Sequence, residues 1–294
     1  MSTIPEGQQD RPSPRAVGTG AYPRELAQFA LPMKPTTETM WSRSNGDFTY
    51  TVTAATMHDA NNQPYQQMPS GKYARAALFY LFSYARGTAD KKLSLGANPS
   101  DYLKLAGVSK TGSGHREALR QLELVARAQF TVRQVTVVED TAKGPYESEQ
   151  LSGGILAEDL RLWTPLAEGK SEKLTSSVVI SRYFEQMVDR AVPIPRSAWR
   201  YLMKHSKSAL PLDVYVWLCH RLYHMPRESR ISWTQLHQQF GSVSEIHEFK
   251  RAFRKALKLV ETVYPEARIT EEQGKSQRKE GPQGGCNHQV HSKT

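Results

Sequence analysis

Apolar residues recur with helical spacing in four long segments of this chain, and short segments of alternating polarity lie between them. Each helical segment is long enough for three or more turns and has a predominantly apolar face. The four predicted helices span residues 72–86, 115–129, 208–225 and 244–264. The pattern therefore indicates an α+β protein in which helices and short strands alternate.

The first half of the chain adds strands and a short helix to its two long helices. Residues 98–108 predict a short helix, with Asn98 or Ser100 as its N-cap and Gly107 at its end. Strands are predicted within 44–54, after an Asn-Gly turn, and at 91–96, 130–140 and 153–163, with a turn at 110–114 and a loop at 142–150. This order of elements is that of a winged-helix domain.

The second half repeats the order more clearly. A strand running into a helix at 174–188 precedes the core helix, and a short strand at 230–233 follows it. A short helix at 232–241, capped by Ser232, is joined by a tight turn to the long helix, for which Ser244 is the predicted N-cap. A strand at 267–270 closes the pattern. The sequence thus predicts two tandem winged-helix domains with disordered N- and C-terminal tails.

The domain limits follow from shifts in composition. Both ends of the chain are rich in Pro, Gly and Gln and poor in large apolar residues, so they cannot offset the entropy of ordering. We predict a mostly disordered tail at 1–40, a first domain at 41–173 for dimerisation, DNA binding or both, a second and main DNA-reading domain at 174–270, and a disordered tail at 271–294.

Charge favours an anionic partner. The 294 residues carry a formal net charge of +10, with 39 Lys and Arg against 29 Asp and Glu. Two cysteines form no disulfide framework, which favours a reducing compartment. No apolar run approaches the roughly 20 residues that span a bilayer. We therefore predict a cytoplasmic protein, associated with nucleoid or plasmid DNA and not with a membrane.

The helix at 244–264 has the most informative charge pattern. Each residue of a helix lies about 100° after the last, and on this basis the cations fall together on one face. The adjoining apolar face is predicted to consist of Ile246, Phe249, Phe253, Ala256, Leu257 and Val260. A solvated face is the ordinary explanation for such a pattern. However, solvated helices usually interleave Glu with Lys, whereas here like charges lie three and four residues apart. Bound phosphates would neutralise that repulsion.

The short helix and turn before it complete a helix-turn-helix, in which the first turns of the second helix enter the major groove. The side chains in those turns are predicted to meet base edges, and the later cations are predicted to meet phosphates. The predicted base-reading residues are Ser244, His247, Lys250 and Arg251, and the predicted phosphate-binding residues are Arg254, Lys255 and Lys258.

The helix at 115–129 resembles a weaker copy of the same pattern. Its arginines gather on one side, but Glu123 lies beside them. Its predicted apolar face consists of Leu119, Leu122 and Ala126. Two interpretations stay open: a second DNA-binding helix, or a packing or dimerisation helix with salt bridges. The predicted DNA contacts under the first interpretation are Lys110, His115, Arg116 and Arg120.

Signals for catalysis are absent from the sequence. Gly169-Lys170-Ser171 and Gly274-Lys275-Ser276 lack the earlier glycine of a phosphate-binding loop. The carboxylates form no visible acid–base pair, and Trp199, Trp217 and Trp233 are predicted to be core residues. We predict a non-enzymatic binding protein with no cofactor and no metal site.

Several stretches also resemble a known family. ALPLDVYVWLCHRLYHMPRESRISWTQLHQQFG, followed by FKRAFRKALKLVETVYPEARI, is similar to the C-terminal signature of plasmid-encoded RepA replication initiators. SNGDFTYTVTA, PSGKYARAALFYLFSYA and VSKTGSGHREALRQLELVARAQF resemble the N-terminal half of that family. The likeness covers roughly residues 41–270, with Pro69-Ser70-Gly71 where a Pro-Tyr-Gly-like turn is expected.

The resemblance implies two winged-helix domains that bind direct repeats (iterons) in a plasmid origin as double-stranded DNA. It also implies origin opening, recruitment of the host initiator and replicative helicase, and a homodimer in equilibrium with monomers whose dimers repress the protein's own gene. The alternative is a winged-helix transcriptional repressor with no role in replication.

Overall fold

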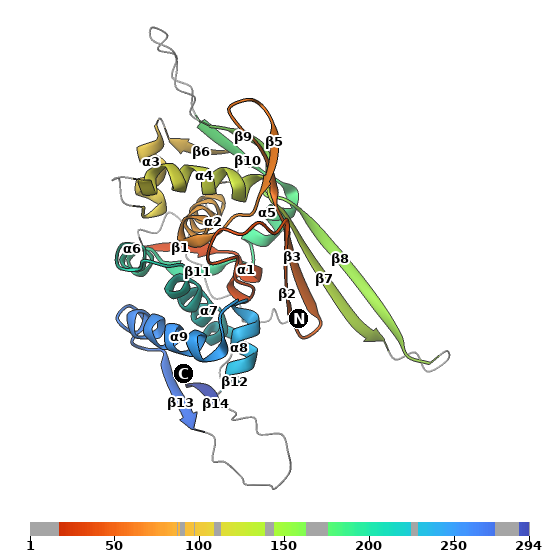
Figure 1. The fold of residues 1–294 in the computed structure, drawn as a ribbon, viewed down its shortest axis with the longest axis vertical. Coiled ribbons are helices and arrows are strands. Elements are labelled where there is room, and N and C mark those ends of the chain that lie inside the picture. Colours follow the sequence, from red (N-terminus) through yellow and green to blue (C-terminus); the bar gives the residue numbers. More distant parts are fainter. Residues whose placement is uncertain are drawn as a thin grey trace, which may run out of the picture.

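The computed structural model describes residues 18–86, 88, 92–96, 98–108, 113–138, 144–162, 176–224, 229–273 and 288–293 (Figure 1). The helices are α1 (Arg24–Gln28), α2 (Gly71–Ala85), α3 (Pro99–Ala106), α4 (Ser113–Arg127), α5 (Arg182–Val188), α6 (Arg196–His205), α7 (Leu210–His224), α8 (Trp233–Gln239) and α9 (Ile246–Glu261). The strands are β1 (Thr19–Tyr22), β2 (Met40–Asn45), β3 (Phe48–Thr53), β4 (Ala55–His58), β5 (Pro64–Gln67), β6 (Lys92–Gly96), β7 (Gln129–Val138), β8 (Tyr146–Ile155), β9 (Ala157–Arg161), β10 (Ser176–Ile180), β11 (Val192–Pro195), β12 (Ser229–Ser232), β13 (Arg268–Gln273) and β14 (His288–Lys293). The predicted α+β class is confirmed.

The first half contains the predicted order of helix, strand, two helices and hairpin. Helix α2 is apolar on almost every side and packs against α4 in the core. The Asn98 side chain accepts a hydrogen bond from the Asp101 N–H, and Gly107 ends α3 with a φ of 77°. Asn98, and not Ser100, is therefore the N-cap, and the predicted end at Gly107 is confirmed.

A four-stranded antiparallel sheet in the order β2-β3-β7-β8 extends from the body of the molecule as a long arm (Figure 1). The predicted loop at 142–150 is wrong in its second part, because Tyr146–Ile155 forms β8. Almost all side chains of β8 are exposed, so its sequence shows no alternation of buried and exposed positions. Backbone pairing with all ten residues of β7 forms this strand instead of side-chain burial.

The predicted boundary at 173/174 divides a sheet. Strand β10 lies between β6 and β9 in a three-stranded sheet, so it belongs with the first half. The polar composition around 165–173 predicts a linker, but residues 163–175 lie outside the described part of the chain. The strands on either side of this stretch, β9 and β10, pair with each other in the same sheet.

The predicted tail at 1–40 is also wrong for the residues that the structure describes. Strand β1 pairs antiparallel with β11. Tyr22, Leu26, Phe29 and Leu31 are buried in the core. These apolar residues are few and show no periodicity over the short elements, so composition could not reveal that they pack against partners far along the chain.

The second half contains α7, β12, α8 and α9 in the predicted order. The Ser232 side chain caps α8 by accepting from the Gln235 N–H, as predicted. Strand β14 pairs between β12 and β13, so residues 288–293 of the predicted C-terminal tail form a strand. Residues 274–287 lie outside the described ranges. Within those ranges, the helices are too short or too polar to cross a bilayer.

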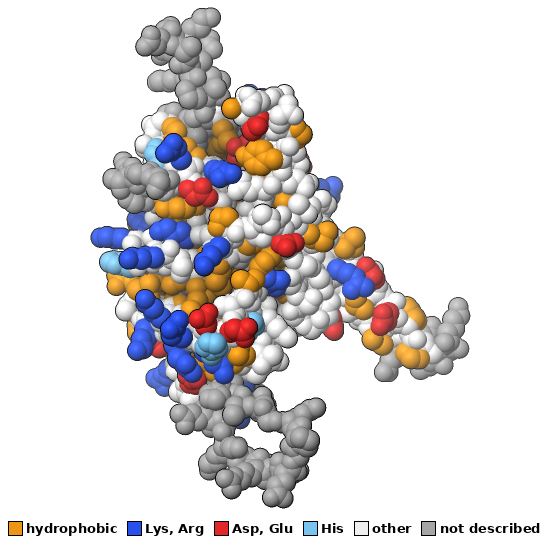
Figure 2. Space-filling model, viewed as in Figure 1, with side chains coloured by type: hydrophobic (Ala, Val, Ile, Leu, Met, Phe, Trp, Pro, Cys, Tyr) orange, Lys and Arg blue, Asp and Glu red, His pale blue; other side chains and the backbone are white. Residues whose placement is uncertain are grey.

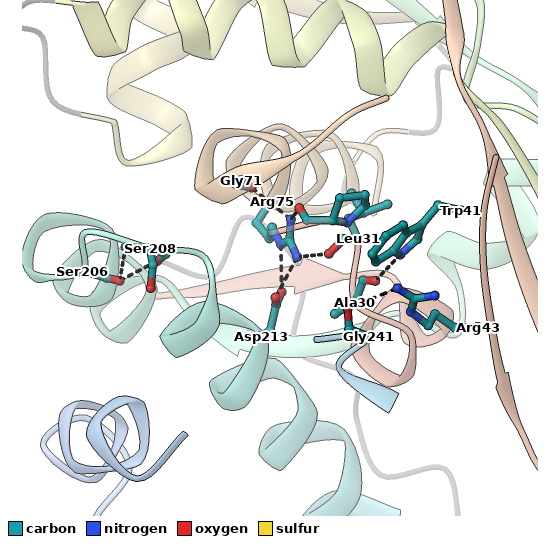
Figure 3. A network of polar contacts seen from close by, with 11 residues as sticks. Ala30, Leu31, Trp41, Arg43, Gly71, Arg75, Ser206, Ser208, Asp213 and Gly241 are labelled. Carbon is teal, nitrogen blue, oxygen red and sulfur yellow. Dashed lines mark hydrogen bonds and ion pairs between the residues drawn. The ribbon is translucent and has the colours of Figure 1, made fainter. Parts of the chain in front are cut away.

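A buried ion pair joins the two halves (Figure 3). Nε and Nη2 of Arg75 on α2 donate to the two carboxylate oxygens of Asp213 on α7, at 2.9 and 2.7 Å. Arg75 is 0% exposed and Asp213 4%. The same guanidinium donates to the carbonyls of Leu31, Pro32 and Gly71. One continuous hydrophobic core surrounds this pair and includes residues of both halves.

A second polar connection reaches from β2 to the turn between α8 and α9 (Figure 3). Nη2 of Arg43 donates to the carbonyl of Gly241 at 3.1 Å. The Arg43 guanidinium lies 3.5 Å from the ring centroid of Trp41, whose Nε1 donates to the Ala30 carbonyl. Burial lowers the pKa of Arg43. The first half therefore contacts the turn that orients α9.

Replacing the carboxylate of the buried pair tests its contribution. We expect Asp213→Asn to lower the free energy of unfolding by about 3–5 kcal/mol, because the buried Arg75 charge loses its counter-charge. Urea unfolding followed by circular dichroism measures the change. The control is Glu149→Gln, which breaks the exposed pair with Arg133; equal midpoints for the two variants would contradict the assignment.

Two glycines with the same φ angle test the Arg43 contact. Gly46 and Gly241 both have a φ of 57°. A Cβ at Gly46 would meet nothing within 4 Å, whereas one at Gly241 would meet the Arg43 guanidinium. We expect Gly46→Ala to cost about 1–2 kcal/mol for its left-handed backbone, and Gly241→Ala to cost more. Equal losses in urea unfolding would show that Arg43 does not restrain the turn.

Candidate nucleic-acid interface

Helix α9 is held on the body of the molecule by an aromatic cluster. Phe249 and Phe253 are buried, each about 1% exposed. The Phe253 ring packs edge-on against Trp233 and Phe240, with centroids 5.6 and 5.4 Å apart, and against Trp217 of α7 at 6.4 Å. Because α7 and α8 supply these partners, the inner face of α9 cannot rotate without breaking the cluster.

The predicted apolar face of α9 is largely confirmed. Phe249, Phe253, Ala256 and Val260 are buried. Leu257 is only half-buried, and Ile246 is 36% exposed. Ile246 is the first residue of the helix, where no element covers it. The buried face therefore begins one turn later than the periodicity predicts.

The predicted DNA contacts of α9 lie on or beside its outer face, where Lys and Arg side chains gather near α9 in Figure 2. Five of them are exposed: His247, Arg251, Arg254, Lys255 and Lys258. Lys250 and Ser244 are half-buried. Arg251 lies 3.8 Å from Glu248, but both side chains are more than half exposed, so solvent screens the pair.

Ser244 does not cap α9. The N-cap is Glu245, whose side chain makes no capping bond. Instead, the Ser244 hydroxyl lies 2.8 Å from that of Ser242, and its carbonyl oxygen lies 2.7 Å from Nε2 of His237. Ser244 therefore makes its hydrogen bonds within the turn between α8 and α9. The first N–H groups of α9 have no side-chain cap from the N-cap residue.

A tryptophan and a glutamate organise the cations, and sequence reasoning did not assign either to the site. Lys250 and Arg254 lie over the Trp233 ring, at 5.7 and 5.3 Å from its centroid. Arg254 also donates two hydrogen bonds to Glu271 of β13, at 2.9 and 2.6 Å. Nε1 of Trp233 donates to the same carboxylate at 3.2 Å. The three side chains form one connected unit.

This unit changes the electrostatics of Arg254. The hydrogen bond to Glu271 raises the pKa of Arg254, so its charge is firmly retained. Glu271 compensates part of that charge, however, and a phosphate at Arg254 would compete with the carboxylate. The exposed side chains of Lys255 and Lys258 have no such carboxylate partner among the described residues.

Helix α4 is anchored through a buried glutamine. Gln121 is 0% exposed; its Oε1 accepts from the Ser70 N–H at 2.8 Å, and its Nε2 donates to Glu117. Leu122 and Ala126 of the predicted apolar face are buried, whereas Leu119 is only half-buried. The structure thus fixes α4 against the start of α2.

The predicted contacts of α4 are only partly available. Arg116 is exposed, and His115 is half-buried. Arg120 is exposed, and its Nη2 donates to Oε1 of Gln67 on β5. Arg127 pairs with Glu123 at 3.0 Å, as the salt-bridge interpretation anticipates. Lys110 lies outside the described residues.

Cys219 is a free cysteine on α7. Burial raises the pKa of the Cys219 thiol to about 12, so it stays protonated at neutral pH. It lies on α7 at the edge of the core.

Two crystal structures of domains 2 and 3 of RctB are similar to this fold. The structure of selenomethionine derivatives covers 92% of this chain and 98% of its own, with a TM-score of 0.58 and 13% identity. The other covers 92% and 97%, with a TM-score of 0.55 and 14% identity. At these identities the likeness concerns the fold.

Sequence comparison gives the family. No curated protein matches the chain. The family model described as "Plasmid encoded RepA protein" matches residues 68–235, which is more than half of the chain. The match runs from just before α2 into α8 and so includes α3, α4 and the buried ion pair. The chain therefore belongs to the family of plasmid-encoded RepA proteins, which are replication initiators.

Proposed function

We propose that this chain starts plasmid replication by binding direct repeats in the origin as duplex DNA, with α9 as its main reading helix. The observation that carries the proposal is the outer face of α9. That face presents a row of exposed cations, while an aromatic cluster fixes its inner face. In a replication initiator, the anionic partner that such a helix fits is origin DNA.

The first turns of α9 would meet the bases. His247 and Arg251 are exposed at that end of the helix, and an arginine there can bond bidentately to guanine. The Lys250 ammonium lies over the Trp233 ring, and the Ser244 hydroxyl is hydrogen-bonded to the Ser242 hydroxyl within the turn. These contacts favour Arg251 as the principal base-reading residue and give Ser244 and Lys250 secondary roles.

The later turns would hold phosphates. Lys255 and Lys258 are exposed, and Arg254 would exchange its carboxylate partner for a phosphate. Helix α4 is the proposed second DNA-binding helix, through Arg116, Arg120 and His115, and Lys110 of the predicted turn before it would add a fourth contact. Helix α4 has three Lys and Arg residues against five in α9, and its Arg127 is paired with Glu123, so α4 would contribute less than α9.

The remaining parts of the proposal rest on the family. They are local opening of the origin, recruitment of the host initiator and replicative helicase, and a monomer–dimer balance in which dimers repress the gene. In each of these the protein acts by binding and not by catalysis.

Footprinting on the DNA that flanks the gene tests the proposal. We expect protection of direct repeats, with a protected length greater than one helix can read, because two modules would contact successive major grooves. A duplex of the same composition with scrambled repeats is the control. Equal protection of both duplexes would contradict sequence-specific binding.

Removing the later cations should weaken binding to every sequence. We expect Arg254→Ala combined with Lys258→Ala to lower the slope of log K against log salt by up to about 1.8, since each phosphate contact contributes about 0.9. The loss should be smaller if Glu271 keeps Arg254 from a full phosphate contact. Titrations by fluorescence anisotropy at several salt concentrations measure it, and an unchanged slope would remove both residues from phosphate binding.

Removing the exposed arginine of the first turns should act differently. We expect Arg251→Ala to cost about 1–3 kcal/mol on repeat DNA and much less on random DNA, because it would lose a base contact. The readout is the ratio of the two affinities at one salt concentration. If both affinities fall by the same factor, Arg251 binds the backbone and does not read bases.

A further inference from the structure

Helix α6 and the residues that follow it contain a second cluster of Lys and Arg side chains, which lies outside both predicted DNA-binding helices. Arg200, Lys204 and Lys207 are exposed. The rings of Tyr201 and His205 on the same helix are in tilted contact, with centroids 4.3 Å apart. Residues 196–209 contain no Asp or Glu. In the described part of the chain, no ion pair joins these three cations to an acid.

Their spacing repeats the feature that distinguishes α9. Arg196, Arg200 and Lys204 follow at intervals of four, so like charges are neighbours on the helix and repel. Arg196 is held inward, because its Nε donates to the Thr19 carbonyl and its guanidinium lies 5.6 Å from the Tyr84 ring. The helix dipole favours Lys204 in the last turn. It does not account for Arg200 one turn earlier.

The inner face of α6 fixes where these cations lie. Trp199 is fully buried and stacks on Phe79 of α2 at 4.3 Å. Its Nε1 donates to the Ala106 carbonyl at 3.3 Å, and its ring borders Gly107. Ala106 and Gly107 end α3, the helix that precedes α4 along the chain. These contacts hold α6 against α2 and the end of α3, and they leave its outer face exposed beside the end of α3.

Helix α6 also packs on α7, and α7 in turn packs against α9. Nζ of Lys72 on α2 donates to the Ser206 carbonyl just after α6. In Figure 1, α6 lies between α4 and α9, and in Figure 2 blue side chains gather over α6 and α9 along the same edge. The position of α6 is therefore intermediate between the two proposed readers.

We propose that Arg200, Lys204 and Lys207 bind phosphates of the duplex between the segments contacted by α4 and α9. This inference rests on the proposed function. Two major-groove segments on one face of a duplex lie about 34 Å apart, and the backbone between them faces the protein. A surface of exposed cations at that place neutralises phosphates without reading sequence. Tyr201 and His205 shape the edge of the same surface.

The test is the triple variant Arg200→Gln, Lys204→Gln and Lys207→Gln in the full chain, titrated on repeat and scrambled duplexes. The expected result is a salt slope lower by up to about 2.7, from about 0.9 per contact. Affinity falls by the same factor on both duplexes, so their ratio is unchanged. The three side chains are exposed, so the thermal midpoint stays that of the wild type.

A charge-matched variant separates local contact from net charge. Lys34→Gln, Arg133→Gln and Arg161→Gln remove three exposed cations from elements other than α6, and the slope is expected to fall by far less. A second control, Arg200→Lys with Lys204→Arg and Lys207→Arg, keeps the charges and retains the wild-type slope. Equal slopes in the two glutamine variants overturn the inference, as does loss of the wild-type slope in the charge-conserving variant.

The outcomes also separate this inference from the function beneath it. If the wild type binds repeat and scrambled duplexes equally, the proposed sequence-specific function fails. If the wild type prefers repeats and Arg251→Ala reduces that preference, while the α6 variant behaves like its charge-matched control, only the role of α6 is overturned.

Discussion

The arrangement of the two proposed reading helices depends on the buried pair of Arg75 and Asp213. An arginine has five N–H donors, and in Arg75 they serve both Asp213 oxygens and three backbone carbonyls. A guanidinium removed from water needs such complete pairing, because a missing carbonyl leaves a buried N–H donor unsatisfied and a missing carboxylate leaves a buried charge uncompensated. Helix α4 packs on α2, and α9 packs on α7. The bond between α2 and α7 therefore sets the relation between both readers.

The interface is more strongly constrained than a row of surface cations. Trp233 supports two of the α9 cations through its ring and bonds the acid that pairs with one of them. Arg43 reaches the turn before α9 from the other half of the molecule. The orientation of α9 thus responds to residues on β2, α7, α8 and β13. Changes in the first half can therefore alter the orientation of α9 without replacing any of the proposed DNA-contacting residues.

Local sequence predicted the elements whose own residues determine them. The periodicity of 72–86, the cap at Ser232, the end of α3 at Gly107 and the cationic face of α9 all depend on neighbours in the sequence. What could not be predicted depends on distant partners. Strand β8 has no buried pattern and exists through β7, and β10 completes a sheet begun at β6. The pairing of Arg254 with Glu271 and the contact of Arg43 with Gly241 join residues that no local pattern relates.

Strand β1 has a consequence for how the molecule forms. It leaves the ribosome early, yet its partner β11 is synthesised some 170 residues later. Until then Tyr22 lacks the second-half residues that bury it beside Trp199. Closing so long a segment is entropically expensive and slows folding. The two halves are consequently not independent folding units. The N-terminal strand of the nascent chain stays without its partner strand until most of the protein has been synthesised.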